Sequence, residues 1–202
     1  TGFIVTLISV GLGAMIAWSL KTTQSKSMKA ALLLAVSIPF WMSSVIKIYA
    51  WTVLLQTEGM VNKFLKLIGV IDKPLQLLYN EVAVVIGMVY QLLPWATIPL
   101  FAFFSYIDRD LLIAAQGLGA SRIRALRTIL FPLALPGIFA TAIIVYVISI
   151  GFYVTPVILG GFTSAFSATL IQMNIFQFYD LVGAAITALT LLIGGLLLIG
   201  IG

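Results

Sequence analysis

A short polar segment, AAQGLGASRIRALRTILFPLALPGI (residues 114–138), contains the residues of this chain whose types and spacing suggest a defined task. Two glycines are followed by three basic residues, Arg122, Arg124 and Arg127. The second glycine, Gly119, can adopt the left-handed backbone conformation that ends a helix. Arginines beside a tight turn provide charge for docking and contain neither a nucleophile nor a base. The segment therefore predicts a contact surface.

Capping residues predict a helix on each side of this turn. Asp108 can cap a helix over residues 109–118, and Ser121 can cap a second over 121–128. Pro132 and Pro136 are expected to separate the second helix from the apolar sequence that follows. Residues 108–131 thus predict a helix–turn–helix, and the alternative is an ordinary loop with basic residues that set membrane topology.

The composition places the chain in a membrane. Of its 202 residues, 62% are hydrophobic and 8% are charged, whereas a soluble domain has roughly 25% charged residues. The chain has no Cys and no His, so disulfides and the commonest general base and metal ligand are excluded. The net charge of +5 is spread too thinly for a nucleic-acid surface, and no nucleic-acid partner is expected.

Five apolar segments are each long enough to cross a bilayer as a helix, which takes about 20 residues. They predict an all-α membrane protein with spans at residues 1–20, 30–55, 81–106, 132–160 and 180–202. The first span starts at Thr1 without a charged leader, so we expect that another span precedes it outside this numbering.

The connecting segments differ in basic charge, and this difference predicts the orientation. Segments 21–29 and 107–131 hold seven Lys and Arg residues, whereas segment 56–80 holds three, which are offset by Glu58 and Asp72. Basic segments stay in the cytoplasm. Segments 21–29 and 107–131 are therefore predicted to be cytoplasmic.

The segment around the turn resembles the cytoplasmic signature of ATP-binding-cassette importer permeases, E-A-A, three residues, G, nine residues, I-x-L-P. Five residues match the signature at the right spacing: Ala114, Ala115, Gly119, Ile129 and Pro132. The sequence "LGAS" extends the match to Ala120 and Ser121. Ile113 and Phe131 replace the Glu and the Leu of the signature. "PFWMSSVIKIYAWTVLL", "EGMVNKFL" and "TPVILGG" resemble the spermidine/putrescine-type permeases of this class.

The resemblance implies one permease domain over residues 1–202, in a bacterial-type inner membrane. It implies that a coupling surface of this chain docks on the ATPase subunits, which are present in two copies. The residues of this coupling surface are Ala114, Ala115, Gly119, Ala120, Ser121, Arg122, Arg124, Ile129 and Pro132. It also implies a second permease subunit, which would be a related but different chain, and an extracytoplasmic solute-binding protein. ATP and Mg²⁺ would bind to the ATPase, so this chain is expected to be no enzyme and to hold no cofactor.

The resemblance favours import of a polyamine such as spermidine or putrescine. Iron, an opine, a phosphonate or another small organic solute is the alternative within the class. An alternative from another class of protein is a secondary transporter or channel that works alone. Such proteins usually use ionisable groups deep in the membrane. No Asp, Glu or His lies in the middle of a predicted span.

Polar and aromatic residues near the bilayer midplane are candidates for the solute pathway, because polar groups in a membrane usually face the bundle or a pathway. We predict that the following residues line it: Tyr90, Gln91, Trp95, Tyr146 and Ser149. The alternative is that they make helix–helix contacts alone.

Lys47 is the one charged residue well inside a predicted span. It lies ~26 Å from the inner surface by helix rise. We expect its side chain to reach the outer interface, and the alternative is a place in the translocation path or its outer gate.

The predicted orientation can be tested with single cysteines. Cysteines at Lys26 and Arg124 should be shielded from an impermeant thiol reagent outside intact cells, and a cysteine at Lys66 should react. The chain has no Cys of its own, so each label reports one site. Labelling of position 124 from outside would reverse the orientation.

Overall fold

The computed structural model describes residues 1–160 and 167–201, and over these residues it is helical with no strand. The expected all-α fold is confirmed. The elements are α1 (Gly2–Thr22), α2 (Lys26–Trp41), α3 (Ser44–Leu55), α4 (Met60–Leu67), α5 (Glu81–Tyr106), α6 (Arg109–Gly117), α7 (Arg122–Ala125), the π-helix η1 (Leu126–Leu130), α8 (Phe131–Ile150), α9 (Val154–Gly160), α10 (Ser167–Phe176) and α11 (Leu181–Ile201).

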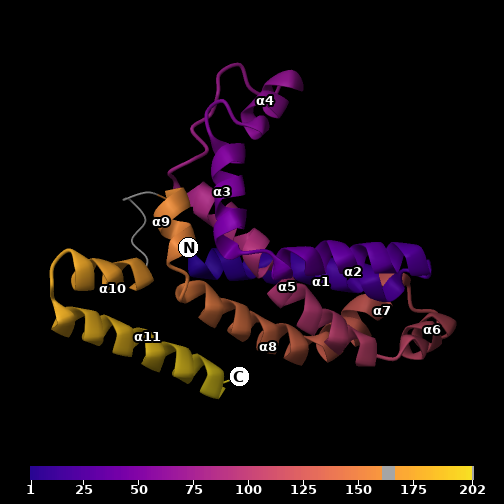
Figure 1. The fold of residues 1–202 in the computed structure, drawn as a ribbon. Helices are drawn as coiled ribbons and strands as arrows, with labels where there is room; N and C mark the ends of the chain where they lie inside the picture. The colour runs from indigo at the N-terminus through magenta and orange to yellow at the C-terminus, as the bar shows by residue number, and fades with distance from the viewer. Residues whose placement is uncertain (161–166, 202) are drawn as a thin grey trace.

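Helices α1, α2, α5 and α8 run side by side and form the body of the molecule (Figure 1). Buried residues of α5 form the centre of the core, which includes Val84, Met88 and Leu92. Along α1, small residues face α5: Ser9 and Ala17 are fully buried, and a Cβ added at Gly13 would lie 2.8 Å from the Cβ of Ala96. Small side chains therefore let these two backbones approach closely, as helix pairs in lipid require.

Three helical stretches of the described chain are long and apolar enough to cross a membrane: Gly2–Thr22, Glu81–Tyr106 and Ile123–Ile150. The first two agree with the predicted spans 1–20 and 81–106. Helix α11 occupies the last predicted span, 180–202, and its searched part, Leu181–Leu197, is apolar. It packs against α10 and touches α8 (Figure 1).

The prediction of one straight span over residues 30–55 is wrong. Helix α2 ends at Trp41, α3 begins at Ser44, and the chain bends by 103° at this break, measured between Lys26–Trp41 and Ser44–Leu67. Pro39 lies within the last turn of α2, and proline removes a helical hydrogen bond and strains the turn before it. Met42 and Ser43 then take extended backbone angles, so α3 leaves the bundle at the corner (Figure 1).

The prediction of a span over residues 132–160 is wrong at both ends. Helix α8 ends at Ile150, and the shorter α9 begins only at Val154. At the other end, Pro132 and Pro136 lie within a helix that continues from α7 through η1. In η1 the N–H of Phe131 donates to the carbonyl of Leu126. This wider spacing relieves the clash of a proline ring with the carbonyl four residues before it.

The two basic segments lie at the same end of the bundle, as the charge pattern requires. Lys21 Nζ donates to the carbonyl of Phe104 at 2.7 Å and also to that of Ile107. Lys29 lies over the ring of Phe101, 5.4 Å from its centroid. Segment 21–29 therefore contacts the end of α5, from which segment 107–131 begins.

At the other end, α3, α4 and the loop to α5 project from the bundle (Figure 1). The buried side chain of Asn62 fastens α4 to this loop: its amide nitrogen donates to the carbonyl of Leu75 at 2.8 Å, and its oxygen accepts from the Leu75 N–H at 2.9 Å. The projection is thus held by specific hydrogen bonds.

Because α1 and α5 approach closely at Gly13, a larger side chain there should lower the stability of the protein, whereas a larger side chain at Gly11 should not. Gly13→Val should lower the melting temperature of the purified protein, because overpacking costs about 1–3 kcal/mol. Gly11→Val is the matched control, since a Cβ there meets nothing within 4 Å. Equal thermal stability of the two variants, measured by fluorescence in detergent, would contradict this packing.

Candidate functional site

A cavity of about 410 Å³ lies where α3, α5, α8 and α9 meet. Its walls combine apolar and polar side chains with exposed backbone at the break after α8. The lining residues are Ser44, Ile48, Gln91, Val147, Ile148, Gly151, Phe152, Tyr153, Val154 and Thr155. Among these residues there is no Asp, Glu, Lys or Arg, so the cavity is uncharged and mostly apolar, with a few polar side chains.

Gln91 is the main polar group of this cavity. Its side chain is 5% exposed, and Nε2 donates to Thr155 Oγ1 at 2.7 Å. Its other atom, Oε1, is buried and has no hydrogen-bond partner. A buried acceptor without a partner costs roughly 1–3 kcal/mol. Gln91 thus brings to the cavity wall an amide group whose acceptor has no partner among the described residues.

Helix α9 brings Thr155 to Gln91, and three further contacts hold α9 in place. A Cβ added at Gly87 of α5 would meet Leu159 and lie 3.1 Å from Thr155 Cγ2, so the glycine lets α9 approach. The N–H of Tyr79, in the loop before α5, donates to the carbonyl of Leu159 at 2.9 Å. Helix α9 therefore closes one side of the cavity against α5.

Of the predicted pathway residues, the structure brings Gln91 alone to the lining of this cavity. Tyr90 packs edge-on against Trp51 of α3, with ring centroids 5.7 Å apart. Trp95 packs against Phe40 of α2 at 5.3 Å and is 43% exposed. These aromatic pairs join α2 and α3 to α5.

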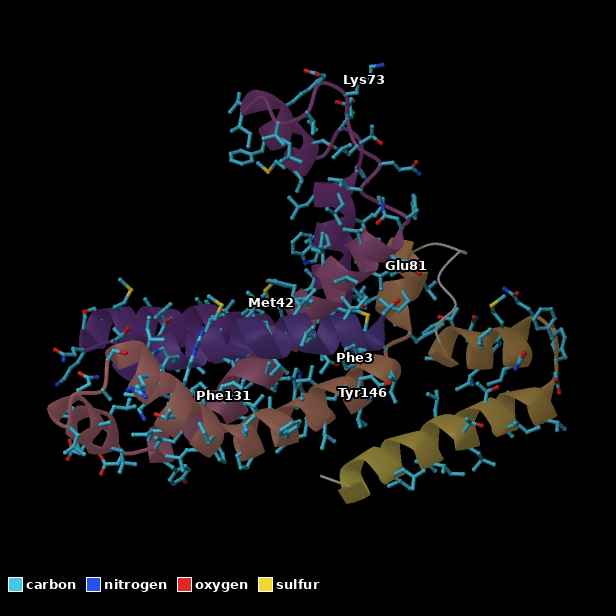
Figure 2. The ribbon with its side chains drawn as sticks, turned by 180° about the vertical axis from the view of Figure 1, so that it is seen from behind. Phe3, Met42, Lys73, Glu81, Phe131 and Tyr146 are labelled. Atoms are coloured by element: carbon cyan, nitrogen blue, oxygen red, sulfur yellow. The ribbon has the colours of Figure 1, made fainter. Side chains whose placement is uncertain are left out.

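Tyr146 and Ser149 of α8 face the beginning of α1. Ser149 is fully buried and donates to the carbonyl of Tyr146 at 2.7 Å. A Cβ added at Gly2 would lie 3.1 Å from Ser149 Oγ and 3.8 Å from Tyr146 Cε2. Figure 2 shows Tyr146 near Phe3, at the N-terminal end of α1. The neighbouring residues Val147 and Ile148 line the cavity instead.

The expectation that Lys47 reaches the outer interface is wrong. The residue is 6% exposed, and its Nζ donates to the carbonyl of Pro39 at 2.8 Å. The helix-rise estimate assumed one straight helix, whereas the 103° bend turns α3 and directs Lys47 back towards α2.

Thr155 is a functional candidate that reasoning from the sequence missed. It follows the break after Gly151 and precedes Pro156. A Thr-Pro pair soon after a glycine inside a long apolar run signals an interrupted helix. The predicted continuous span concealed this signal.

The helix–turn–helix predicted over 108–131 has the expected turn. Gly119 has φ +88°, the N–H of Gly119 donates to the carbonyl of Gln116, and the N–H of Ala120 donates to that of Ala115, both at 3.0 Å. This pair of bonds is a Schellman motif, which satisfies the carbonyls at the end of α6. Asp108 accepts from the N–H of Asp110 at 2.9 Å and caps the start of α6.

The second helix begins as expected at Ser121, whose Oγ accepts from the N–H of Arg124 at 3.3 Å. Ala125 is fully buried, while Arg124 and Arg127 are exposed. Ile129 is half-buried and Pro132 is exposed. The side chain of Arg122 lies outside the part of the chain that the structure describes.

Exposed apolar side chains surround the turn between α6 and α7. Leu118 is 90% exposed, and Ile113 and Ile123 are also exposed. Ala114 is exposed and Ala115 is half-buried, so little side-chain volume covers the end of α6. We call this set, Ile113, Ala114, Ala115, Leu118 and Ile123, the hairpin surface.

The described residues contain no cluster of three or more His, Cys, Asp or Glu side chains that could hold a metal ion. The polar groups of the cavity are neutral, and the hairpin surface is apolar with basic residues beside it. The geometry therefore suits passage of a solute and docking of a partner.

The chain is similar to known transport proteins along almost its whole length. The family model described as binding-protein-dependent transport system inner membrane component matches residues 3–201. The spermidine/putrescine transport system permease protein PotB of Escherichia coli (strain K12) is 35% identical over 197 residues, which cover 97% of this chain and 71% of that protein.

Two further similarities are more limited. The spermidine/putrescine transport system permease protein PotC of Haemophilus influenzae is 33% identical over 85 residues, 42% of this chain and 32% of that protein. A crystal structure of a bacterial ABC transporter involved in the import of the acidic polysaccharide alginate matches with a TM-score of 0.68 at 20% identity. It covers 98% of this chain and 74% of that one, and it shows the fold.

A bundle of apolar helices with an uncharged cavity and an exposed helix–turn–helix at its basic end is typical of a membrane transport subunit. The chain belongs to the family of binding-protein-dependent transport system inner membrane components. It is a permease subunit of an ATP-binding-cassette importer and a multi-pass protein of a bacterial inner membrane.

Proposed function

We propose that this permease moves a polyamine of the spermidine/putrescine class into the cytoplasm. The observation that carries the proposal is the buried, unpartnered Oε1 of Gln91 in the cavity wall. A primary ammonium group has three donors and no acceptor, so it complements this atom. The similarity to PotB over 97% of the chain supports the same solute class.

Aromatic side chains add to this site. Phe152 and Tyr153 line the same cavity, and aromatic faces attract ammonium groups by about 0.5–2 kcal/mol. The lining includes no carboxylate, so binding rests on neutral acceptors and rings. A site inside a transporter has to release its solute as well as bind it, and moderate affinity without an ion pair suits that cycle.

The energy for transport would come from another subunit. The sequence contains no Gly-x4-Gly-Lys-Ser/Thr phosphate loop, which supports the proposal that two ATPase copies bind ATP and Mg²⁺ and that this chain is not itself an enzyme. The hairpin surface is the proposed docking site for one ATPase copy. Its exposed Leu118 offers an apolar side chain for a groove, and its small Ala114 and Ala115 permit close approach.

Two further partners complete the proposed transporter. The partial similarity to PotC supports a second, related permease subunit beside this one. An extracytoplasmic binding protein would deliver the solute at the end of the bundle opposite the hairpin surface, where α4 and the loop to α5 project (Figure 1).

If Gln91 binds the solute, the KM for uptake should depend on the charge of the side chain at this position. In cells that express the whole transporter, Gln91→Leu should raise the KM for labelled putrescine about tenfold, because a hydrogen bond to a charged group contributes about 1.5–3 kcal/mol. Gln91→Glu should lower the KM, because it adds a negative charge beside a cationic solute.

The control for this experiment is Gln177→Leu, at an exposed position between α10 and α11, which should leave uptake unchanged. A higher KM for Gln91→Glu would show that the solute is not a cation. No uptake of putrescine or spermidine by the wild-type transporter would disprove the polyamine proposal.

The hairpin surface predicts that the turn is needed for assembly. Gly119→Val should reduce co-purification of the ATPase and stop solute-dependent ATP hydrolysis, because a β-branched residue in the left-handed region costs roughly 1–2 kcal/mol and redirects α7. The spans should still insert, since none of them is altered.

Gly117→Val is the matched control. A Cβ meets nothing within 4 Å at either glycine, but only Gly119 of the two has positive φ. Full ATPase recovery and normal uptake with Gly119→Val would mean that the segment is an ordinary loop.

A further inference from the structure

The break between α2 and α3 leaves a backbone carbonyl without its helical partner. In a continuous helix the N–H of Ser43 would donate to the carbonyl of Pro39. Helix α2 ends at Trp41 and Ser43 is extended, so that bond is missing. An unsatisfied carbonyl in an apolar bundle costs several kcal/mol.

The ammonium group of Lys47 takes the place of the missing N–H. Its Nζ donates to the carbonyl of Pro39 at 2.8 Å across the corner. The carbonyl end of a helix also carries partial negative charge, which favours a cation there. The bond joins α2 to α3 at the point where the chain changes direction, and Figure 2 marks this corner by Met42.

Lys47 lies on the face of α3 that points into the molecule. Ser44 and Ile48, three residues before and one after, line the cavity that contains Gln91. Trp51, one turn further, packs on Tyr90, while Phe40 of α2 packs on Trp95. Each half of the bent pair therefore contacts α5 separately.

A buried lysine is expensive, and this one has no acidic neighbour in sequence. Residues 26–57 include no Asp or Glu, so no carboxylate of α2 or α3 compensates the charge. A methionine would fill similar space at lower cost. The compensation observed for Lys47 is the Pro39 carbonyl, which indicates that the bond itself has a use.

We propose that Lys47 is a positioning residue for transport. Its ammonium replaces the backbone donor lost at the α2–α3 break, holds α3 at its angle, and so places Ser44 and Ile48 in the cavity wall. The bend itself does not depend on which solute is carried.

The angle can be measured with two spin labels in the assembled transporter. The chain has no Cys, so cysteines at Leu34 of α2 and Val53 of α3, both exposed, give one defined pair. The wild type should show one narrow distance distribution. Lys47→Met should shift the ratio of bent to straightened forms by about tenfold, the change expected for loss of one charge-assisted hydrogen bond.

Two variants distinguish loss of the Lys47 hydrogen bond from the general effect of replacing a lysine. Lys47→Arg keeps a cationic donor and should retain the narrow distribution, whereas Lys66→Met removes an exposed lysine of α4 and should change nothing. If Lys47→Met does not assemble, Lys47→Gln is measured instead, because its shorter side chain stays polar but does not span the break. A Lys47→Met or Lys47→Gln distribution equal to the wild type would overturn the proposal.

Uptake gives an independent reading. Lys47→Met should raise the KM for labelled putrescine several-fold with normal amounts of transporter in the membrane, and Lys47→Arg should restore it. A KM unchanged in Lys47→Met would also overturn the proposal. If the wild type carries no putrescine, the solute assignment fails, while the distance measurement still decides the role of Lys47.

Discussion

In a bilayer every backbone N–H and carbonyl has to find a partner within the protein, and this constraint explains most of the structure. Helical hydrogen bonds meet it along most of α1, α5 and α8; in α5, Pro94 and Pro99 leave the carbonyls of Tyr90 and Trp95 without a helical N–H. Where the chain breaks, other groups satisfy the backbone: Lys47 donates to the carbonyl of Pro39, and the N–H of Tyr79 donates to that of Leu159. The breaks also border the cavity, since α3 and α9 both follow one. The polar site thus lies where regular helix gives way.

Helix α5 links this site to the end of the bundle that holds the hairpin surface. It has 26 residues and is about 39 Å long, with Gln91 in its first half and the carbonyl of Phe104 near its end. Lys21 of α1 binds that carbonyl, and α6 begins a few residues later. Movement of the hairpin surface would therefore act on the helix that carries the main polar group of the cavity. This continuity supports the proposal that ATP hydrolysis in a partner subunit controls solute access.

The sequence predicted features that depend on local physics. The Gly119 turn and its caps at Asp108 and Ser121 follow from backbone preferences and from side chains that accept backbone hydrogen bonds. The bend after Trp41 was missed because hydropathy is the same for straight and broken spans, although Pro39 hinted at it. Gln91 was found because polarity deep in an apolar run is conspicuous. Its partner Thr155 was not found, because the contact depends on how α9 folds back on α5.

The same contacts indicate which parts can move. Helices α1 and α5 are joined by close packing along their length, with backbones in near contact at Gly13, and such packing changes little without a large loss of contact. Helices α3 and α9 contact α5 over shorter stretches than α1 does. Their share of the core is Ile48 and Leu55 of α3 and Leu159 of α9, so they can move with a smaller loss of packing. Opening of the cavity should therefore occur at α3 and α9, while the α1–α5 pair transmits force as a rigid unit.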